Sequence, residues 1–222
     1  MTWLWSLFER GGPSMYAIAA VALMGFSIYI ERLLALRGLV PHLRALTSAV
    51  HDAKRDLPKM MRHCTDGKYG VAPVLGRGGE AAMRGASRDE ILAVMSREGR
   101  RLTLRLKRGL GALSMLGTMA PFLGLLGTVL GIMQALRDLG AATATGAGAG
   151  YSVVARGVAE ALITTAAGIV VAVVLVGLHQ NLRGRLSAAV LEVQLLAEET
   201  AERFAAAATP EASAPEAGDS EA

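Results

Sequence analysis

Three long apolar blocks dominate the pattern of hydrophobic and polar positions. They cover residues 13–30, 109–136 and 161–178, each without a charge, and the third extends back to residue 153 past one arginine. About 20 apolar residues in a helix are enough to cross a bilayer core about 30 Å thick. A buried helix of a water-soluble bundle would need a polar face, which these blocks lack. The pattern therefore predicts transmembrane helices over 13–30, 109–136 and 153–178.

The first block has an alternative interpretation as a cleaved signal peptide. Such a peptide has basic residues before its apolar core and small residues at a cleavage site after it. Here Glu9 and Arg10 come before the block, and the more basic flank, residues 31–37, comes after it. We therefore expect an uncleaved membrane helix.

Amphipathic stripes follow or precede the apolar blocks. Leucine and other apolar residues recur at steps of three and four residues over 33–50, 91–113 and 182–196. This spacing predicts helices that extend all three membrane helices beyond the bilayer. Between the first two stripes, turns are predicted where glycine and proline gather, at Gly67, Gly70, Pro73, Gly76, Gly78 and Gly79.

Composition adds the orientation of the chain. The residues are 52% hydrophobic and 19% charged, and 17 of the 23 lysines and arginines lie between residues 31 and 108. The segment between the second and third blocks holds only Arg137 and Arg156. Basic residues near membrane helices stay in the cytoplasm. This predicts an N-out/C-in topology, and it explains the basic residues without nucleic acid.

The predicted organisation follows from these signals. Residues 1–12 form an outer interfacial segment that carries Trp3, Trp5 and Phe8, since aromatic rings favour the membrane interface. Residues 209–222 form an acidic, proline-containing tail that we expect to be disordered. The remaining regions between the membrane helices are a cytoplasmic helical region over 31–108, a periplasmic hairpin over 137–152 and a cytoplasmic helix over 179–208.

The second and third blocks are rich in small residues at spacings of four. Small-xxx-small patterns allow helix backbones to approach closely in lipid, which is the simplest interpretation of most of these residues. The patterns are Ala120 with Gly124, Gly127 with Gly131, and Thr164 with Gly168 and Ala172. Pro121 removes a backbone donor and can bend the second helix.

Polar side chains inside the blocks are the candidate functional residues. They are Thr118, Thr128, Glu160, Thr164 and Thr165. A carboxylate within a membrane helix is a functional hypothesis by default. The alternative for Glu160 is an interfacial ion pair with Arg156, four residues earlier. Threonine hydroxyls can also bond to carbonyls of their own helix.

Known enzymatic motifs and metal sites are missing from the sequence. It contains no GxSxG, HExxH or P-loop motif, and Cys64 is its only cysteine. An intramembrane enzyme would have to be built on Ser114 or His179, with nothing to complete the site. We predict no enzymatic activity, no cofactor and no metal. We also expect a partner chain, because the membrane blocks contain no complete set of titratable groups for an ion path.

Three strings of residues together resemble the MotA/TolQ/ExbB proton-channel family. Residues 120–133, Ala-Pro-Phe-Leu-Gly-Leu-Leu-Gly-Thr-Val-Leu-Gly-Ile-Met, resemble its second-helix motif. Residues 158–172, Val-Ala-Glu-Ala-Leu-Ile-Thr-Thr-Ala-Ala-Gly-Ile-Val-Val-Ala, resemble its third-helix motif. Residues 30–37, Ile-Glu-Arg-Leu-Leu-Ala-Leu-Arg, resemble the exit from its first helix. Three spans in 222 residues are similar to the ExbB/TolQ branch.

This resemblance implies a function and a set of partners. It implies a homopentamer in the bacterial inner membrane, with two copies of a single-span ExbD/TolR-like partner in its central pore. The partner's membrane aspartate carries the proton, and motion passes to an envelope protein. By the family's motifs, Thr128 and Thr165 line the pore, and Glu160 stands at the family's third-helix glutamate.

Several alternatives stay open at this point. The driven system can be outer-membrane import, envelope maintenance or gliding motility, and the ion can be a proton or sodium, with protons favoured by the resemblance. The rival from another class is a passive three-span scaffold that packs against a transporter. That rival explains the small-xxx-small patterns, but not the hydroxyls and the carboxylate among them.

Overall fold

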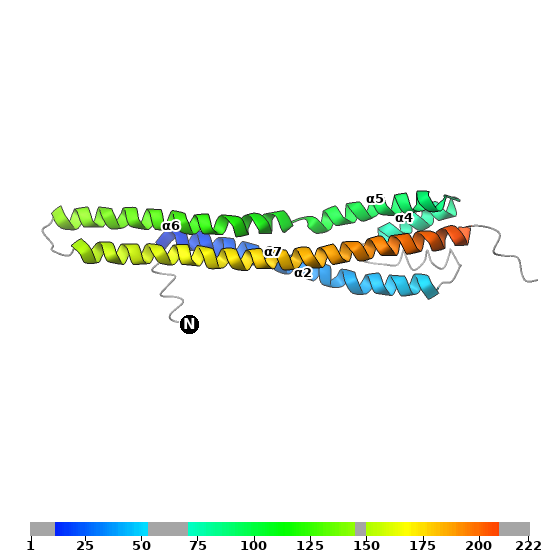
Figure 1. Ribbon diagram of the computed structural model, residues 1–222, viewed down its shortest axis with the longest axis horizontal. Coiled ribbons are helices and arrows are strands. Elements are labelled where there is room, and N and C mark those ends of the chain that lie inside the picture. The colour runs from blue at the N-terminus through cyan, green and yellow to red at the C-terminus, as the bar shows by residue number, and fades with distance from the viewer. Residues whose placement is uncertain (1–11, 53–70, 145–149, 209–222) are drawn as a thin grey trace, which may run out of the picture. The chain divides into compact units, whose positions relative to one another are not determined.

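A computed structural model of the chain describes residues 12–52, 71–144 and 150–208. Every regular element in these ranges is an α-helix, so the predicted all-α fold class is confirmed. The helices are α2 (Gly12–Asp52), α4 (Ala72–Met83), α5 (Arg88–Lys107), α6 (Leu110–Ala144) and α7 (Gly150–Ala208) (Figure 1). The predictions for residues 1–11, for Gly67 and Gly70 and for the acidic tail lie outside the described residues.

Three helical segments of the described chain are long and apolar enough to cross a membrane. They lie in Gly12–Arg37, Arg88–Ala144 and Gly150–Ala208, and each contains one of the predicted apolar blocks. The protein is therefore a multi-pass membrane protein. The helices also continue past the predicted spans: α2 extends to Asp52, and α6 extends to Ala144 through the first half of the predicted hairpin.

The chain divides into two compact units, and α2 and α7 contribute to both. Met1–Arg32 and Gly109–Arg183 make up the first, which we call the apolar unit. Leu33–Arg108 and Gly184–Ala222 make up the second, which we call the polar unit.

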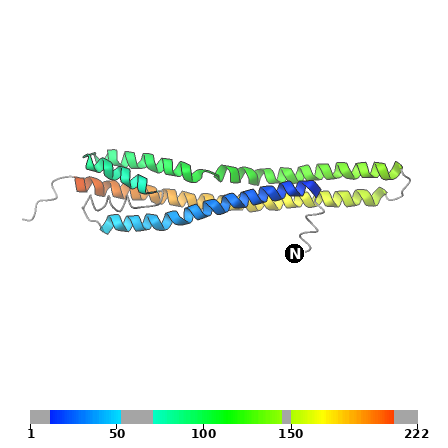
Figure 2. The same cartoon turned by 180° about the vertical axis from the view of Figure 1, so that it is seen from behind.

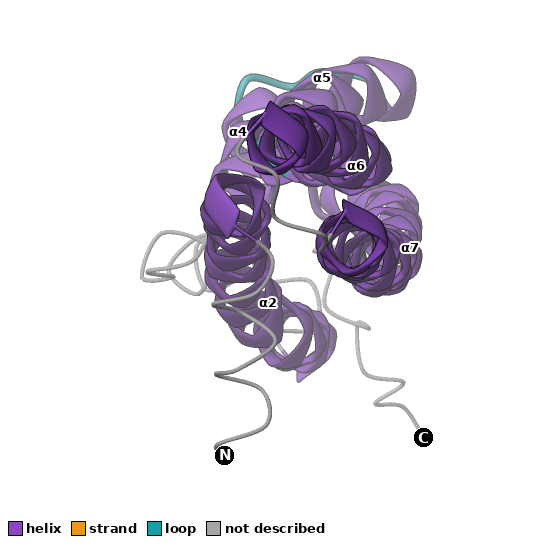
Figure 3. Ribbon diagram, turned by 90° about the vertical axis from the view of Figure 1, so that its left-hand side faces the viewer, coloured by secondary structure: helices purple, strands orange, loops and turns teal. Residues whose placement is uncertain are grey.

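The apolar unit is a bundle of three helices. The first part of α2 packs beside α6 and α7, which run antiparallel to each other (Figures 1–3). Most of the large apolar side chains of α6 are exposed in the single chain, including Phe122, Leu126 and Leu130, while its buried residues are mostly small. The unit therefore buries small residues between helices and presents large apolar residues outward, as expected in lipid.

The glycines of residues 76–79 do not form the predicted turns. They lie within α4, a helix that begins with Pro73 in its first turn, where the missing N–H costs nothing. Gly78 and Gly79 are buried, and a Cβ built on Gly78 would lie 2.5 Å from Sδ of Met95 in α5. The turn prediction was wrong because these glycines serve close helix packing, which a local composition signal does not distinguish from a turn.

Short local motifs fix the boundary between α4 and α5. Gly85 has φ +75°, and its N–H and that of Ala86 bond to the carbonyls of Ala82 and Ala81, which ends α4. Two residues later, Ser87 and Glu90 form a capping box, with Ser87 N–H donating to Glu90 Oε2 at 2.9 Å. These residues explain why α5 begins at Arg88.

A break at Arg108 and Gly109 separates α5 from α6. Gly109 has φ +81°, a left-handed conformation that disfavours any residue with a Cβ, and its carbonyl accepts the first α6 bond from Leu113 N–H. The predicted helical stripe over 91–113 is confirmed, but it lies on two helices, because the apolar spacing continues across the break while the helical backbone does not.

In the polar unit, α5 packs against the last part of α7. Arg88 donates to Glu202 Oε1 at 2.7 Å, and this bond, with the nearby carboxylates, raises the pKa of the Arg88 guanidinium. The predicted stripe on α7 is confirmed as the packing face, because Leu186, Val193 and Leu196 are buried.

Gly76 and Gly78 provide a matched pair of substitutions within α4. Gly76→Ala should stabilise the protein by about 1 kcal/mol, because its Cβ meets no atom within 4 Å and alanine favours a helix. Gly78→Ala should destabilise it by about 1–2 kcal/mol, because its Cβ would overlap Met95. Thermal unfolding of the detergent-solubilised protein checks both, and equal effects of the two variants would contradict the packing described here.

Candidate ion pathway

Small residues bring α6 and α7 into backbone contact. A Cβ built on Gly124 would lie 2.9 Å from the Thr164 carbonyl oxygen and 2.9 Å from Thr165 Cα. From the other side, a Cβ on Gly168 would lie 2.8 Å from the Ala120 carbonyl oxygen. Real Cβ atoms do not approach backbone atoms this closely, so these positions require glycine. The small-xxx-small patterns therefore serve tight helix packing, as the simplest interpretation predicted.

One hydroxyl crosses this contact. Thr165 donates from Oγ1 to the carbonyl oxygen of Gly124 at 2.9 Å. Within α6 the same carbonyl is the helical acceptor for the backbone N–H of Thr128, one turn further along. The hydroxyl of Thr165 thus lies close to the turn of α6 that ends at Thr128.

The other membrane threonines bond to carbonyls of their own helix. Thr128 donates to Leu125 at 2.7 Å, Thr164 donates to Ala161 at 2.7 Å, and the exposed Thr118 donates to Met115 at 2.9 Å. Thr128 and Thr164 are 9% and 1% exposed, so both lie inside the bundle. These backward bonds satisfy the hydroxyl protons and leave the oxygen lone pairs available as acceptors.

Three helices meet at Gly127. A Cβ built there would lie 2.5 Å from Thr164 Oγ1 and 2.8 Å from Ser14 Oγ of α2. Sequence reasoning did not select Ser14, although a serine near the start of an apolar block is a visible signal. This polar junction marks the side of the α6–α7 contact that faces α2.

Helical geometry then separates the candidate residues into two groups. On α6, Gly127 and Thr128 point about 100° apart, so Thr128 lies on the edge of the contact away from α2. On α7, Thr165 is turned about 100° from Thr164 in the same way. Thr128 and Thr165 therefore share one edge, on either side of the Gly124 carbonyl.

Glu160 lies elsewhere on α7. It precedes Thr165 by five positions, which turns its side chain about 140° around the helix, close to the direction of Thr164 and the α2 side. The side chain is half-buried, and no cation of the described ranges pairs with its carboxylate. In particular, the structure has no ion pair between Glu160 and Arg156.

Unpaired polar atoms also occur near Pro121 and His179 in the apolar unit. Pro121 removes the donor that would pair with the Gly117 carbonyl, yet α6 continues through it without ending. The Nδ1 atom of His179 on α7 is buried without a hydrogen-bond partner. Ser114, the other residue considered for an enzymatic site, lies on α6.

Residues 68–195, which are more than half of the chain, match the MotA/TolQ/ExbB proton channel family. The chain belongs to this family. Both candidate threonines, Glu160 and the Gly124–Gly168 contact lie inside the matched region.

Individual relatives point to the ExbB/TolQ branch of the family. The chain is 29% identical over 200 residues to an ExbB homolog of biopolymer transport from Methanothermobacter thermautotrophicus, covering 87% of this chain and 68% of that protein. It is 29% identical over 207 residues to an ExbB-like biopolymer transport protein from Synechocystis, covering 86% and 78%. It is 38% identical over 94 residues to the Tol-Pal system protein TolQ of Pseudomonas aeruginosa, covering 42% and 37%. The resemblance inferred from the three sequence strings is therefore confirmed at the level of family and branch.

Proposed function

We propose that this chain is the pore-forming subunit of a proton-driven motor in the bacterial inner membrane. Five copies would surround two copies of a single-span ExbD/TolR-like partner, and proton flow would be converted into motion that an envelope protein receives. The observation that carries the proposal is the shared edge of Thr128 and Thr165 beside the Gly124 carbonyl, within a bundle of largely apolar helices.

The chemistry of that edge suits a moving carboxylic acid. Gly124 and Gly168 hold α6 and α7 close together, so the two hydroxyls lie near each other at the edge of this contact, where a partner helix would pass. The hydroxyl oxygens of Thr128 and Thr165 can accept a bond from a protonated carboxyl group, and either hydroxyl can rotate out of its carbonyl bond to donate to the ionised form. One charge that crosses 100 mV gains about 2.3 kcal/mol, which is enough to reverse a modest preference between two rotational states.

Glu160 is proposed as a second element of the ion path. Its position on the α2 side means that it does not bond to the same carboxyl group as Thr165 at the same moment. A carboxylate among apolar helices without a cation partner strongly affects the local field. We propose that the negative charge of Glu160 attracts protons and so determines at which end of the pathway they enter.

Removal of the hydroxyls should reduce ion-driven activity and leave the assembly intact. Thr128→Val and Thr165→Val keep the side-chain shape and should each lower proton flux about tenfold or more, by loss of a hydroxyl that contacts the carboxyl group. The assay is flux into vesicles that contain the chain with an ExbD/TolR-type partner, under an imposed membrane potential, with native mass measurement of the complex.

Thr118→Val is the matched control, because Thr118 lies on the same helix and its hydroxyl bonds to its own helix on the exposed surface. It should leave flux unchanged. Full flux in both test variants would exclude the proposed pathway. Loss of the oligomer in both would assign the threonines to packing, and wild-type vesicles without any flux would favour the passive scaffold.

The proposed topology is tested separately. A cysteine introduced at Ala144, the last residue of α6, in a Cys64→Ser background should react with a membrane-impermeant reagent added from outside. The expectation follows from the concentration of basic residues in 31–108, which keeps that segment in the cytoplasm. A cysteine at Arg84 should be protected in the same cells. The opposite labelling pattern would contradict the N-out/C-in topology.

A further inference from the structure

Two exposed faces of opposite charge lie on α5 and on the last part of α7 in the polar unit. The basic α5 face consists of Arg97, Arg100 and Leu104, and Leu104 is 68% exposed. The acidic α7 face consists of Leu191, Leu195 and Glu198, and both leucines are 56% exposed. Leu191 and Leu195 lie one helical turn apart and form a short apolar strip on the surface, which is the kind of feature that contacts between proteins use.

Helical spacing places the members of each face together. Arg97 and Arg100 precede Leu104 by seven and four residues, so all three lie on one side of α5. Leu191, Leu195 and Glu198 follow one another at steps of four and three residues on α7. Each face is therefore a continuous strip with an apolar centre.

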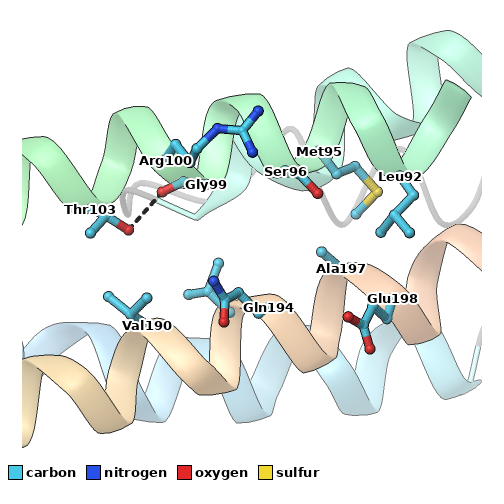
Figure 4. Close-up of a pocket in the computed structure, with 11 residues that line it drawn as sticks. Leu92, Met95, Ser96, Gly99, Arg100, Thr103, Val190, Gln194, Ala197 and Glu198 are labelled. Carbon is cyan, nitrogen blue, oxygen red and sulfur yellow. Dashed lines mark hydrogen bonds between the residues drawn. The ribbon is translucent and has the colours of Figure 1, made fainter. Parts of the chain in front are cut away.

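The charged groups of these faces are not used in ion pairs within the described part of the chain. Arg101, Glu199 and Glu202 lie nearby but pair with Glu98, Arg203 and Arg88, respectively. Arg97, Arg100 and Glu198 have no such partner. Arg100 and Glu198 both line a cavity of about 360 Å³ between α5 and α7, yet Figure 4 shows them at separate places along it, with no bond between them. Glu198 interacts with Arg88 only at longer range, so all three side chains can still form an ion pair with another molecule.

The two faces also lie at similar positions along the axes of α5 and α7. Arg88 meets Glu202, and Gly99 lies against Val193, so Arg97 lies level with about residue 194 of α7. Glu198 is one helical turn, about 5.4 Å, from that level, which is within reach of an arginine side chain. Two copies inserted in the same orientation keep these levels, so Arg97 of one copy can meet Glu198 of another.

We propose that the basic α5 face of one copy packs on the acidic α7 face of the next. The inference rests on the proposed oligomeric function and assigns its contact surface in the polar unit. Because the two faces differ, the contact is heterologous, and it builds a ring when the rotation between neighbouring copies closes. A membrane surface or nucleic acid would fit the basic face alone, whereas a second copy explains both faces and their exposed leucines.

Charge reversal tests this contact in the full-length protein. Arg97→Glu and Glu198→Arg should each place like charges in contact and raise the concentration at which the oligomer dissociates about tenfold. The double variant R97E/E198R should restore dissociation close to that of the wild type. Arg84→Glu, a reversal of an exposed arginine outside both faces, should have no effect. Unchanged assembly in both single variants, or no restoration in the double variant, would overturn the proposal.

A second measurement identifies which chains are in contact. In a Cys64→Ser background, cysteines at Arg97 and Glu198 should cross-link into a ladder of dimers and larger species. Cross-links only within one chain would overturn the contact. An oligomeric wild type that conducts protons, combined with intact assembly after charge reversal, would reject this surface and leave the proposed function standing. A monomeric wild type would reject both.

Discussion

Gly124→Ala is expected to separate α6 from α7 and to cause a large loss of stability in the apolar unit. The new Cβ would lie 2.9 Å from two backbone atoms of α7, and backbone cannot move aside as a flexible side chain can. Overpacking of this kind costs about 2–3 kcal/mol, and the cross-helix bond from Thr165 would be lost as well. Reversible unfolding in mixed micelles measures the change, and proton flux should fall with it.

The same helices offer matched controls for this prediction. Gly111 on α6 and Gly177 on α7 are glycines whose built Cβ meets no atom within 4 Å. Their alanine variants should unfold with a free energy equal to or slightly above that of the wild type. Gly168→Ala should behave like Gly124→Ala, because its Cβ would meet the Ala120 carbonyl oxygen. A stable, conducting Gly124→Ala protein would show that the α6–α7 contact is looser than described.

Glu160→Gln is expected to abolish most ion-driven activity while the protein still folds and assembles. Glutamine keeps the shape of the side chain and removes its charge, so the change isolates the electrostatic role. We expect proton flux in vesicles to fall at least about tenfold, the range typical for loss of a group that handles protons. Native mass measurement of the complex with its partner checks that assembly is retained.

Arg156→Gln separates this role from a simple ion pair. If Glu160 served only as an interfacial partner of Arg156, removal of either charge would have the same small effect. The structure has no such ion pair among its described residues, so Arg156→Gln should leave flux close to that of the wild type. Near-normal flux in Glu160→Gln, or equal losses in both variants, would contradict the proposed role of the carboxylate.

Glycine shows where prediction from the sequence succeeded and where it failed. In the apolar blocks, glycines at spacings of four correctly indicated close packing, because a long apolar helix leaves few other uses for them. In residues 76–79 the same residue type suggested turns, but Gly78 lies inside α4 against Met95. The two roles differ only in which atoms lie opposite the glycine. When those atoms belong to a residue far away in the sequence, the residues next to the glycine do not reveal them.

The sequence by itself determined the elements that depend on local periodicity and on long-range composition. The apolar blocks, the amphipathic stripe on α7 and the motifs of the family are properties of consecutive residues, so they could be identified without coordinates. The tertiary structure decided which atoms meet. Only the packing of α7 on α6 turns Thr165 toward the Gly124 carbonyl, places Thr128 on the same edge and places Glu160 on the α2 side. The physical reason is that spacing fixes the direction of a side chain around its own helix, whereas the neighbour that it meets depends on how that helix is rotated against the others.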